Sequence, residues 1–167
     1  MSNIIMEMDG LIFCNTRLEY LDFISGIERA NDDFVFVWPR ERHIEAMDRS
    51  DEMHISIISA YTRELLGYLI LAGIGGEDRE LEFRRMVIAE KGKGYGRIST
   101  RFVKEYCFGV LKYHRLWLDA YTDNEVAIGL YKKEGFIQEG LLRECKRNGD
   151  HYRSMVIMSM LENEYNG

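Results

Sequence analysis

The spacing of hydrophobic residues changes near the middle of the chain, and the change predicts which segments form helices and which form strands. Before residue 90 most apolar and β-branched residues form short runs between polar or glycine-rich turns, a pattern typical of strands. After residue 94 helical and strand-like segments alternate. The predicted strands are 11–15, 53–60, 65–74, 80–89, 115–121, 136–145 and 151–161, and the predicted helices are 17–29, 40–47, 94–111 and 126–134.

This order of elements predicts an α+β fold with a mixed sheet, because antiparallel strands come first and a strand–helix–strand crossover follows. No internal repeat, low-complexity run or proline-rich linker divides the chain, so residues 1–167 are expected to form a single domain. The composition agrees with this expectation: 46% of the residues are hydrophobic, 30% are charged, and proline occurs once. These values are typical of a globular protein.

Charge is distributed unevenly between the two halves of the chain. Residues 1–83 contain 17 Asp and Glu against 7 Arg, a net charge of −10, whereas residues 84–167 contain 11 acidic and 15 basic residues, a net charge of +4. This asymmetry favours a polyanionic ligand for the second half and a neutral or cationic ligand for the first. No basic stripe interleaved with aromatic residues is present, so no nucleic-acid partner is expected.

Several other classes of protein are not expected. The first ten residues include Glu7 and Asp9 where a secretory signal needs a basic and an apolar region, and the apolar stretch 68–74 is far shorter than the about 20 residues of a membrane span. We therefore expect no membrane partner. The cysteines are odd in number and widely spaced, which predicts no disulfide framework and a reducing, cytoplasmic location. The histidines lack metal-ligand spacing, so no metal is expected. The cysteines are Cys14, Cys107 and Cys145, and the histidines are His43, His54, His114 and His151.

A glycine-rich segment between an apolar strand and a helix carries the strongest chemical signal. Its residues are Lys91, Gly92, Lys93, Gly94, Tyr95, Gly96 and Arg97. Alternate glycines allow the unpaired amides of the helix start to approach an anion, and the helix dipole and the cations attract it. The segment is not a Walker A loop, because no glycine precedes Lys-Ser or Lys-Thr, and Arg97 replaces the last glycine of a dinucleotide fingerprint. It predicts a phosphate-binding loop of another kind.

Two segments resemble the GNAT superfamily of acyl-CoA-dependent N-acyltransferases. Residues 91–96 resemble its acyl-donor loop, Q/R-x-x-G-x-G/A, with Lys91 keeping the positive charge but not the planar fork of the first position. Residues 124–136 resemble its N-x-x-A-x-x-L-Y-x-x-x-G-F stretch. Residues 115–119 and the hairpin 140–152 further resemble the branch that contains ribosomal-protein alanine acetyltransferases and spermidine or diamine acetyltransferases.

The resemblance implies a GNAT-like sheet, mostly antiparallel, of about six to seven strands flanked by about four helices. It implies an N-acetyltransferase that transfers the acetyl group of acetyl-CoA directly to a primary amine. The acidic first half favours a cationic acceptor, such as a polyamine, an aminoglycoside or a peptide α-amine. The alternative is a non-catalytic acyl-CoA sensor on the same scaffold. A homodimer formed through an edge strand of the predicted sheet is compatible with the sequence.

The resemblance also implies catalytic residues. Tyr131 is expected to donate a proton to the departing thiolate, because a phenol with an ordinary pKa near 10 is protonated at neutral pH. Glu82 and Glu80 share one face of the strand 80–89, and Glu82 ranks ahead of Glu80 as the base that deprotonates the amine. A chain of water molecules is the alternative to a single base.

Further residues are expected to bind the acyl donor. The backbone groups of Met86, Val87 and Ile88 are expected to hold the pantetheine arm and the oxyanion, and the loop 91–97 is expected to hold the diphosphate. Asn124 is expected to reach the donor or to cap the following helix. Thr122 and Asp123 are equally suitable as caps.

Overall fold

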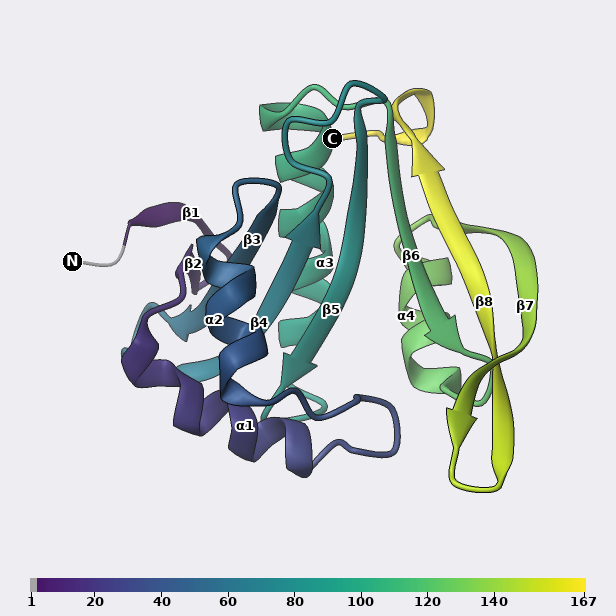
Figure 1. Cartoon of the computed structure of the whole chain (residues 1–167). Coiled ribbons are helices and arrows are strands. Elements are labelled where there is room, and N and C mark those ends of the chain that lie inside the picture. The colour runs from purple at the N-terminus through teal and green to yellow at the C-terminus, as the bar shows by residue number, and fades with distance from the viewer. Residues whose placement is uncertain (1–2) are drawn as a thin grey trace.

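The computed structural model describes residues 3–167 and shows an eight-stranded sheet in the order β1-β2-β3-β4-β5-β6-β8-β7 (Figure 1). Neighbouring strands are antiparallel except β5 and β6, which are parallel. The strands are β1 (Ile4–Met8), β2 (Leu11–Asn15), β3 (Glu52–Ser59), β4 (Leu65–Ala72), β5 (Glu80–Ile88), β6 (Arg115–Tyr121), β7 (Ile137–Asn148) and β8 (His151–Leu161). The helices are α1 (Leu21–Arg29), α2 (Arg40–Asp48), α3 (Tyr95–Lys104) and α4 (Glu125–Lys133).

The predicted mixed α+β fold with four helices is confirmed, and the sheet has one strand more than the hydrophobic pattern indicated. The extra strand is β1, which pairs with β2 through the turn Asp9-Gly10. Both turn residues have positive φ, +47° and +82°. Such a turn matches the right-handed twist of the strands and closes a tight hairpin. The predicted helix 94–111 is divided into α3 and a π-helical segment, Glu105–Val110.

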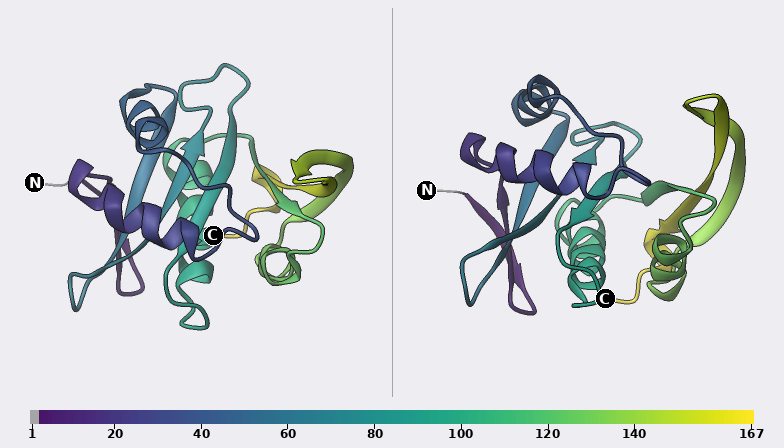
Figure 2. Two further views of the ribbon diagram at one scale, coloured as in Figure 1. Left: turned by 60° about the horizontal axis from the view of Figure 1, so that its bottom comes forward. Right: turned by 90° about the horizontal axis from the view of Figure 1, so that it is seen from below.

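The four helices cover the two faces of the sheet in pairs. Figure 2 shows α1 and α2 on one face and α3 and α4 on the other. The larger core lies under α3 and α4, where the rings of Phe13 and Phe102 stack with centroids 4.0 Å apart. A second core forms under α1, where Leu21 and Ile24 pack against Tyr68 of β4. We call the α1–α2 side the acceptor face.

The sheet opens between β5 and β6. The two strands pair only where Glu80–Glu82 meet Arg115–Trp117, and beyond these residues they diverge (Figure 1). On its other side β5 has a bulge, because Phe83 and Arg85 pair with the consecutive residues Leu71 and Ile70 of β4. The bulge shifts the alternation of side chains along β5 by one residue. We call the opening between the diverging strands the gap.

Candidate active site

One side of the gap is lined by backbone groups of β5. The Ala89 amide donates to the Leu66 carbonyl at 2.9 Å, and Val87 pairs with Tyr68 in the same register. Because successive residues of a strand point their N–H and C=O groups in opposite directions, Val87 is bonded within the β4 ladder. Met86 and Ile88 therefore direct these groups into the gap. Of the three residues expected to contact the acyl donor through their backbone groups, Met86 and Ile88 therefore face the gap and Val87 does not.

The other side of the gap is lined by β6. The Glu162 amide donates to the His114 carbonyl at 2.8 Å, and the Thr122 amide donates to the Ser154 carbonyl at 3.1 Å. In this register the even-numbered residues of β6 are bonded to β8. Asp119 consequently directs its amide and carbonyl into the gap. An extended ligand with amide groups can hydrogen-bond to both strands there.

The glycine-rich loop leads from β5 to the N-terminus of α3. Gly92 and Gly94 have φ values of +76° and +82°, and apart from their chain neighbours no residue among 3–167 lies within 4 Å of where their side chains would begin. Gly94 is the N-cap of α3 and no side chain caps this helix. Its first hydrogen bond runs from the Ile98 amide to the Gly94 carbonyl at 3.1 Å. The amides of residues 95–97 thus point out of the helix without an intrahelical acceptor, which fits a diphosphate.

The remaining residues of the loop have different surroundings. The Lys91 and Lys93 side chains are both exposed, and partial desolvation by the surrounding protein lowers the pKa of Lys91. A side chain at Gly96 would begin 3.5 Å from Leu130 of α4, so this glycine faces the protein. Tyr95 packs against the larger core.

Arg97 is tied to the end of α4. Its Nε donates to Oε1 of Glu134 at 2.7 Å, and Lys104 Nζ lies 2.9 Å from Oε2 of the same carboxylate. The Glu134 side chain is almost fully buried, at 3% exposed. This cluster holds α3 against α4, and the exposed remainder of the Arg97 guanidinium is available to an anion.

Tyr131 lies on α4 and packs against Phe83 of β5 and Phe136, with ring centroids 6.1 and 5.8 Å away. Its hydroxyl makes no hydrogen bond to any other residue in the described range 3–167. Burial, assisted by the negative charge of Asp119, raises the Tyr131 pKa above its ordinary value. The phenol is therefore protonated at neutral pH, as the predicted proton donor must be.

Asn124 is the N-cap of α4. Its Oδ1 accepts a hydrogen bond from the Ala127 amide at 3.2 Å, which satisfies one of the unpaired amides of the helix start. The alternative cap Asp123 instead pairs with Arg153 at 2.7 Å. The Asn124 side-chain amide nitrogen makes no hydrogen bond to another residue of the described range 3–167.

The two glutamates predicted as bases have arginine partners. Glu82 Oε2 accepts from Arg84 Nε and Nη2 at 3.1 and 2.7 Å. Glu80 Oε2 accepts from Arg115 Nε at 2.7 Å. Both glutamates lie on β5 before the strands diverge. To accept a proton from an amine, either carboxylate would have to break a charged hydrogen bond or use its second oxygen.

A buried hydrogen-bonded network lies behind the acceptor face, centred on the fully buried carboxylate of Glu28 in α1. It accepts from Arg85 Nη1 at 2.6 Å, from the Trp38 amide at 2.9 Å and from the Tyr68 hydroxyl, and His43 Nε2 lies 3.4 Å away. Burial opposes the ionisation of Glu28, but these hydrogen bonds and the charge of Arg85 outweigh it and lower its pKa to about 2. The network ties α1 and α2 to β5.

The loop between α1 and α2, residues 30–39, crosses the gap. The Phe36 carbonyl accepts a hydrogen bond from Arg85 of β5 at 2.8 Å, and the Asp33 carbonyl accepts one from Arg153 of β8. Since β5 and β8 lie on opposite sides of the gap, the loop covers it from the acceptor face. The Arg153 guanidinium also lies 3.8 Å from the centre of the Tyr121 ring.

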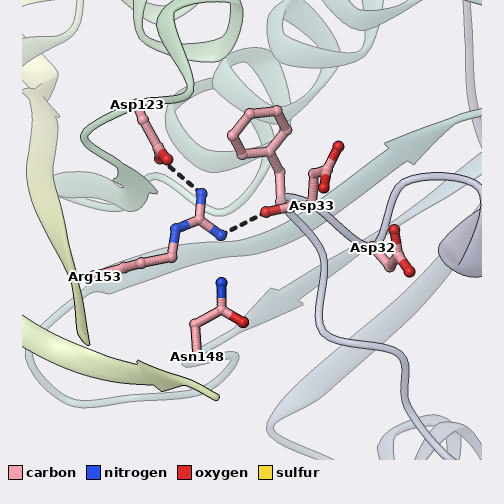
Figure 3. A pocket seen from close by; sticks show the side chains of 6 residues that line it. Asp32, Asp33, Asp123, Asn148 and Arg153 are labelled. Carbon is pink, nitrogen blue, oxygen red and sulfur yellow. Dashed lines mark hydrogen bonds and ion pairs between the residues drawn. The ribbon is translucent and has the colours of Figure 1, made fainter. Parts of the chain in front are cut away.

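A cleft of about 520 Å³ opens beside this loop (Figure 3). It is lined by Asp32, Asp33, Phe34, Asp123, Asn148 and Arg153. Among these described residues Arg153 carries the one positive charge against three carboxylates, and Figure 3 shows its guanidinium directed at Asp123 and at the Asp33 backbone. The cleft therefore favours a cation.

Comparison with known proteins decides the family. Residues 24–136 match the Acetyltransferase (GNAT) family. This chain belongs to that family. The spermidine N(1)-acetyltransferase of Escherichia coli K12 is 31% identical over 138 residues, covering 78% of this chain and 73% of the relative. The corresponding enzyme of Vibrio cholerae is 28% identical over 157 residues, covering 87% and 89%.

Solved structures show the same GNAT fold. The crystal structure of the V. cholerae spermidine N-acetyltransferase in complex with CoA and spermine has a TM-score of 0.83 at 23% identity, covering 94% of this chain and 98% of that one. A dodecameric structure of that enzyme has a TM-score of 0.80 at 24% identity, covering 95% and 97%. The predicted GNAT fold is thereby confirmed. As a GNAT acetyltransferase, the protein uses acetyl-CoA as its cosubstrate.

Sequence reasoning overlooked two parts of this GNAT site. Asp119 lies within the stretch 115–119 that resembles the family, and a carboxylate between apolar Leu118 and Ala120 on a strand is itself a signal of a functional residue. The buried Glu28 network was overlooked because its members are far apart in the chain. Within residues 3–167 no group of three or more His, Cys, Asp or Glu side chains is placed to hold a metal ion, and no helix has the length and apolar character of a membrane span.

Proposed function

We propose that this GNAT acetyltransferase acetylates a primary amino group of a polyamine. The observation that carries the proposal is the acidic cleft at the loop that covers the gap, where three carboxylates face one arginine. Carboxylates contributed by separate segments suit an acceptor with several ammonium groups along a slender chain. The two similar spermidine N(1)-acetyltransferases support the same class of acceptor.

The chain's own residues supply binding and proton transfer. Acetyl-CoA provides the acyl group as a thioester. The free amides of residues 95–97 bind its diphosphate, and the backbone groups of Met86 and Ile88 orient its pantetheine arm. Tyr131 holds the proton that the departing thiolate takes up. The acceptor amine attacks directly, so no acyl-enzyme is needed.

The test is thiol release from acetyl-CoA with spermidine, spermine, an aminoglycoside, a peptide with a free α-amine, and no acceptor. We expect the polyamines to be turned over with the highest kcat/KM. The double variant Asp32→Asn/Asp33→Asn should raise the KM for the polyamine by about 2–25-fold, at about 0.2–1 kcal/mol per exposed charge, with an unchanged KM for acetyl-CoA. Asp9→Asn, in the β1–β2 turn, is the matched control.

Binding of CoA without turnover of any amine would instead indicate the acyl-CoA sensor. Preference for the aminoglycoside or the peptide would contradict the polyamine proposal.

We also propose that the chain forms homo-oligomers, because the hairpin β7–β8 exposes Ile137, Leu141 and Tyr152 at a free sheet edge and the V. cholerae relative forms a dodecamer. A cytoplasmic location is proposed from the exposed thiol of Cys145, which a reducing compartment protects.

A further inference from the structure

The loop that covers the gap is fixed at both of its ends by α1. At its start the Asn31 amide donates to the Glu28 carbonyl, and at its end the Trp38 amide donates to the Glu28 carboxylate, each at 2.9 Å. The middle of the loop is held instead by side chains of the sheet, Arg85 of β5 and Arg153 of β8, which bind two of its carbonyl groups. The course of the loop across the gap therefore depends on these two arginines.

The two arginines hold the loop in different surroundings. Arg85 pairs with the fully buried carboxylate of Glu28, whereas Arg153 pairs with Asp123, whose side chain is 63% exposed. Among residues 3–167, the bond from Arg153 to the Asp33 carbonyl is the one hydrogen bond between the segment 17–48 and the strands β6, β7 and β8. Loss of Arg153 would therefore free the loop from β8 and leave its connection to β5 in place.

Four groups from three segments of the chain surround the Arg153 guanidinium. Nη1 donates to the Asp33 carbonyl, and Nη2 donates to Asp123 Oδ1 at 2.7 Å (Figure 3). The guanidinium carbon lies 3.8 Å from the centre of the Tyr121 ring and 5.4 Å from that of Phe34, both within the range of a cation–π interaction. A planar guanidinium can donate in two directions while it stacks on an aromatic ring, and an ammonium group cannot. These surroundings therefore suit arginine and not lysine.

Arg153 acts at the open end of the gap. The strands β5 and β6 pair at the beginning of β6, and Tyr121, on which Arg153 stacks, is its last residue. The loop residues that Arg153 contacts, Asp33 and Phe34, also line the cleft of Figure 3. An arginine that fixes these residues therefore fixes the wall of the cleft that is proposed to bind the acceptor.

Resting on the proposed acetylation of a polyamine, we propose that Arg153 is a positioning residue, which holds the loop 30–39 across the open end of the gap and so keeps the acceptor cleft in the shape that binds the amine. It takes no part in proton transfer. Without it the loop has to be ordered whenever an acceptor binds, and the entropy lost weakens binding. The acyl donor is bound by β5 and the glycine-rich loop, which Arg153 does not contact.

The sign of the effect separates positioning from simple electrostatics. Arg153 places a positive charge in a cleft that otherwise carries carboxylates. If its charge alone mattered, removing it would strengthen the binding of a polycation. If it positions the loop, removing it weakens that binding. The two roles therefore predict opposite changes in the KM for the amine.

The kinetic experiment compares the wild type with Arg153→Met, Arg153→Lys and the control Arg143→Met, using the best amine of the panel. Arg143 is an exposed residue of β7 in the same hairpin. Arg153→Met should raise the KM for the amine by about 10-fold, as for the loss of a charged hydrogen bond, with the KM for acetyl-CoA unchanged. Arg153→Lys should also raise it, because lysine keeps the charge but not the planar fork.

A second measurement follows the loop without any substrate. A protease that cuts before aspartate can cleave the loop at Asp32 and Asp33, and its rate reports how often the loop leaves its folded position. Cleavage there should be about 10-fold faster in Arg153→Met than in the wild type or Arg143→Met. The Tm should stay close to that of the wild type, because the ion pair with Asp123 is largely exposed.

Three results would overturn the proposal. The first is a folded Arg153→Met variant whose KM for the amine is unchanged or lowered. The second is an equal rise in the KM values for the amine and for acetyl-CoA. The third is cleavage of the loop at the wild-type rate. If the wild type acetylates no amine of the panel, the proposed function fails, and the cleavage rates still show whether Arg153 holds the loop.

Discussion

Glu28→Gln tests the buried network behind the acceptor face. The change removes one negative charge and keeps the shape of the side chain. In the native protein this fully buried carboxylate holds Arg85 at 2.6 Å, and Arg85 in turn holds the Phe36 carbonyl of the loop that covers the gap. Glutamine leaves the guanidinium without its charged partner. We therefore expect the variant to be less stable and to hold this loop more weakly.

The magnitude follows from the pKa and the burial of Glu28. Its pKa of about 2 lies below the ordinary 4.5, and at 1.36 kcal/mol per pH unit its ionisation contributes about 3 kcal/mol at neutral pH. Removing one partner of a buried ion pair costs a similar amount, about 3–5 kcal/mol. For a domain of this length 3 kcal/mol corresponds to a fall in Tm of about 6–12 °C.

The assay is urea unfolding of the wild type, Glu28→Gln and Glu41→Gln at several pH values. Glu41 is an exposed residue of α2 and serves as the matched control. Because the folded pKa is lowered, the contribution of Glu28 is complete above pH 4.5 and is lost as pH falls towards 2. The difference between wild type and variant should shrink over that range. A cost below about 1 kcal/mol at pH 7, or a difference independent of pH, would refute the reasoning.

Two further substitutions test the acyl-donor side. Tyr131→Phe should lower kcat by about 10²-fold, as for the loss of a general acid, with nearly unchanged CoA affinity. Its stability should also be nearly unchanged, because the hydroxyl bonds to no other described residue. Steady-state kinetics and a CoA-binding titration measure these effects, and equal kcat values would show that the phenol plays no part in the reaction. Gly94→Ala places a side chain at a φ of +82°, where alanine is strained by about 1–2 kcal/mol, and should raise the KM for acetyl-CoA while lowering Tm. An unchanged KM in a folded Gly94→Ala variant would exclude this loop from donor binding.

Most of the fold was predictable from periodicity, because strands and helices with one buried face repeat their apolar residues at characteristic intervals. The exception among the strands, β1, is instructive. Its hairpin signal, Asp9-Gly10, is present in the sequence, but the five residues of β1 are largely exposed or only partly buried, so their hydrophobic pattern is weak. Similarly, the helix predicted for 94–111 changes its winding after Lys104, which the apolar spacing alone does not reveal.

The candidate site was predictable only where it is local in the chain. The alternating glycines 92, 94 and 96 indicate a phosphate-binding helix start by themselves, because helix starts and turns depend on neighbouring residues. Together with the stretch 124–136 they carry the resemblance to the GNAT superfamily. The relation of β5 to β6 was decided by the tertiary structure. It opens the gap into which Met86 and Ile88 are directed, and it pairs Glu80 of β5 with Arg115 of β6. Such relations join residues more than thirty positions apart, and pairing at that range depends on register and packing, which no short pattern of residues encodes.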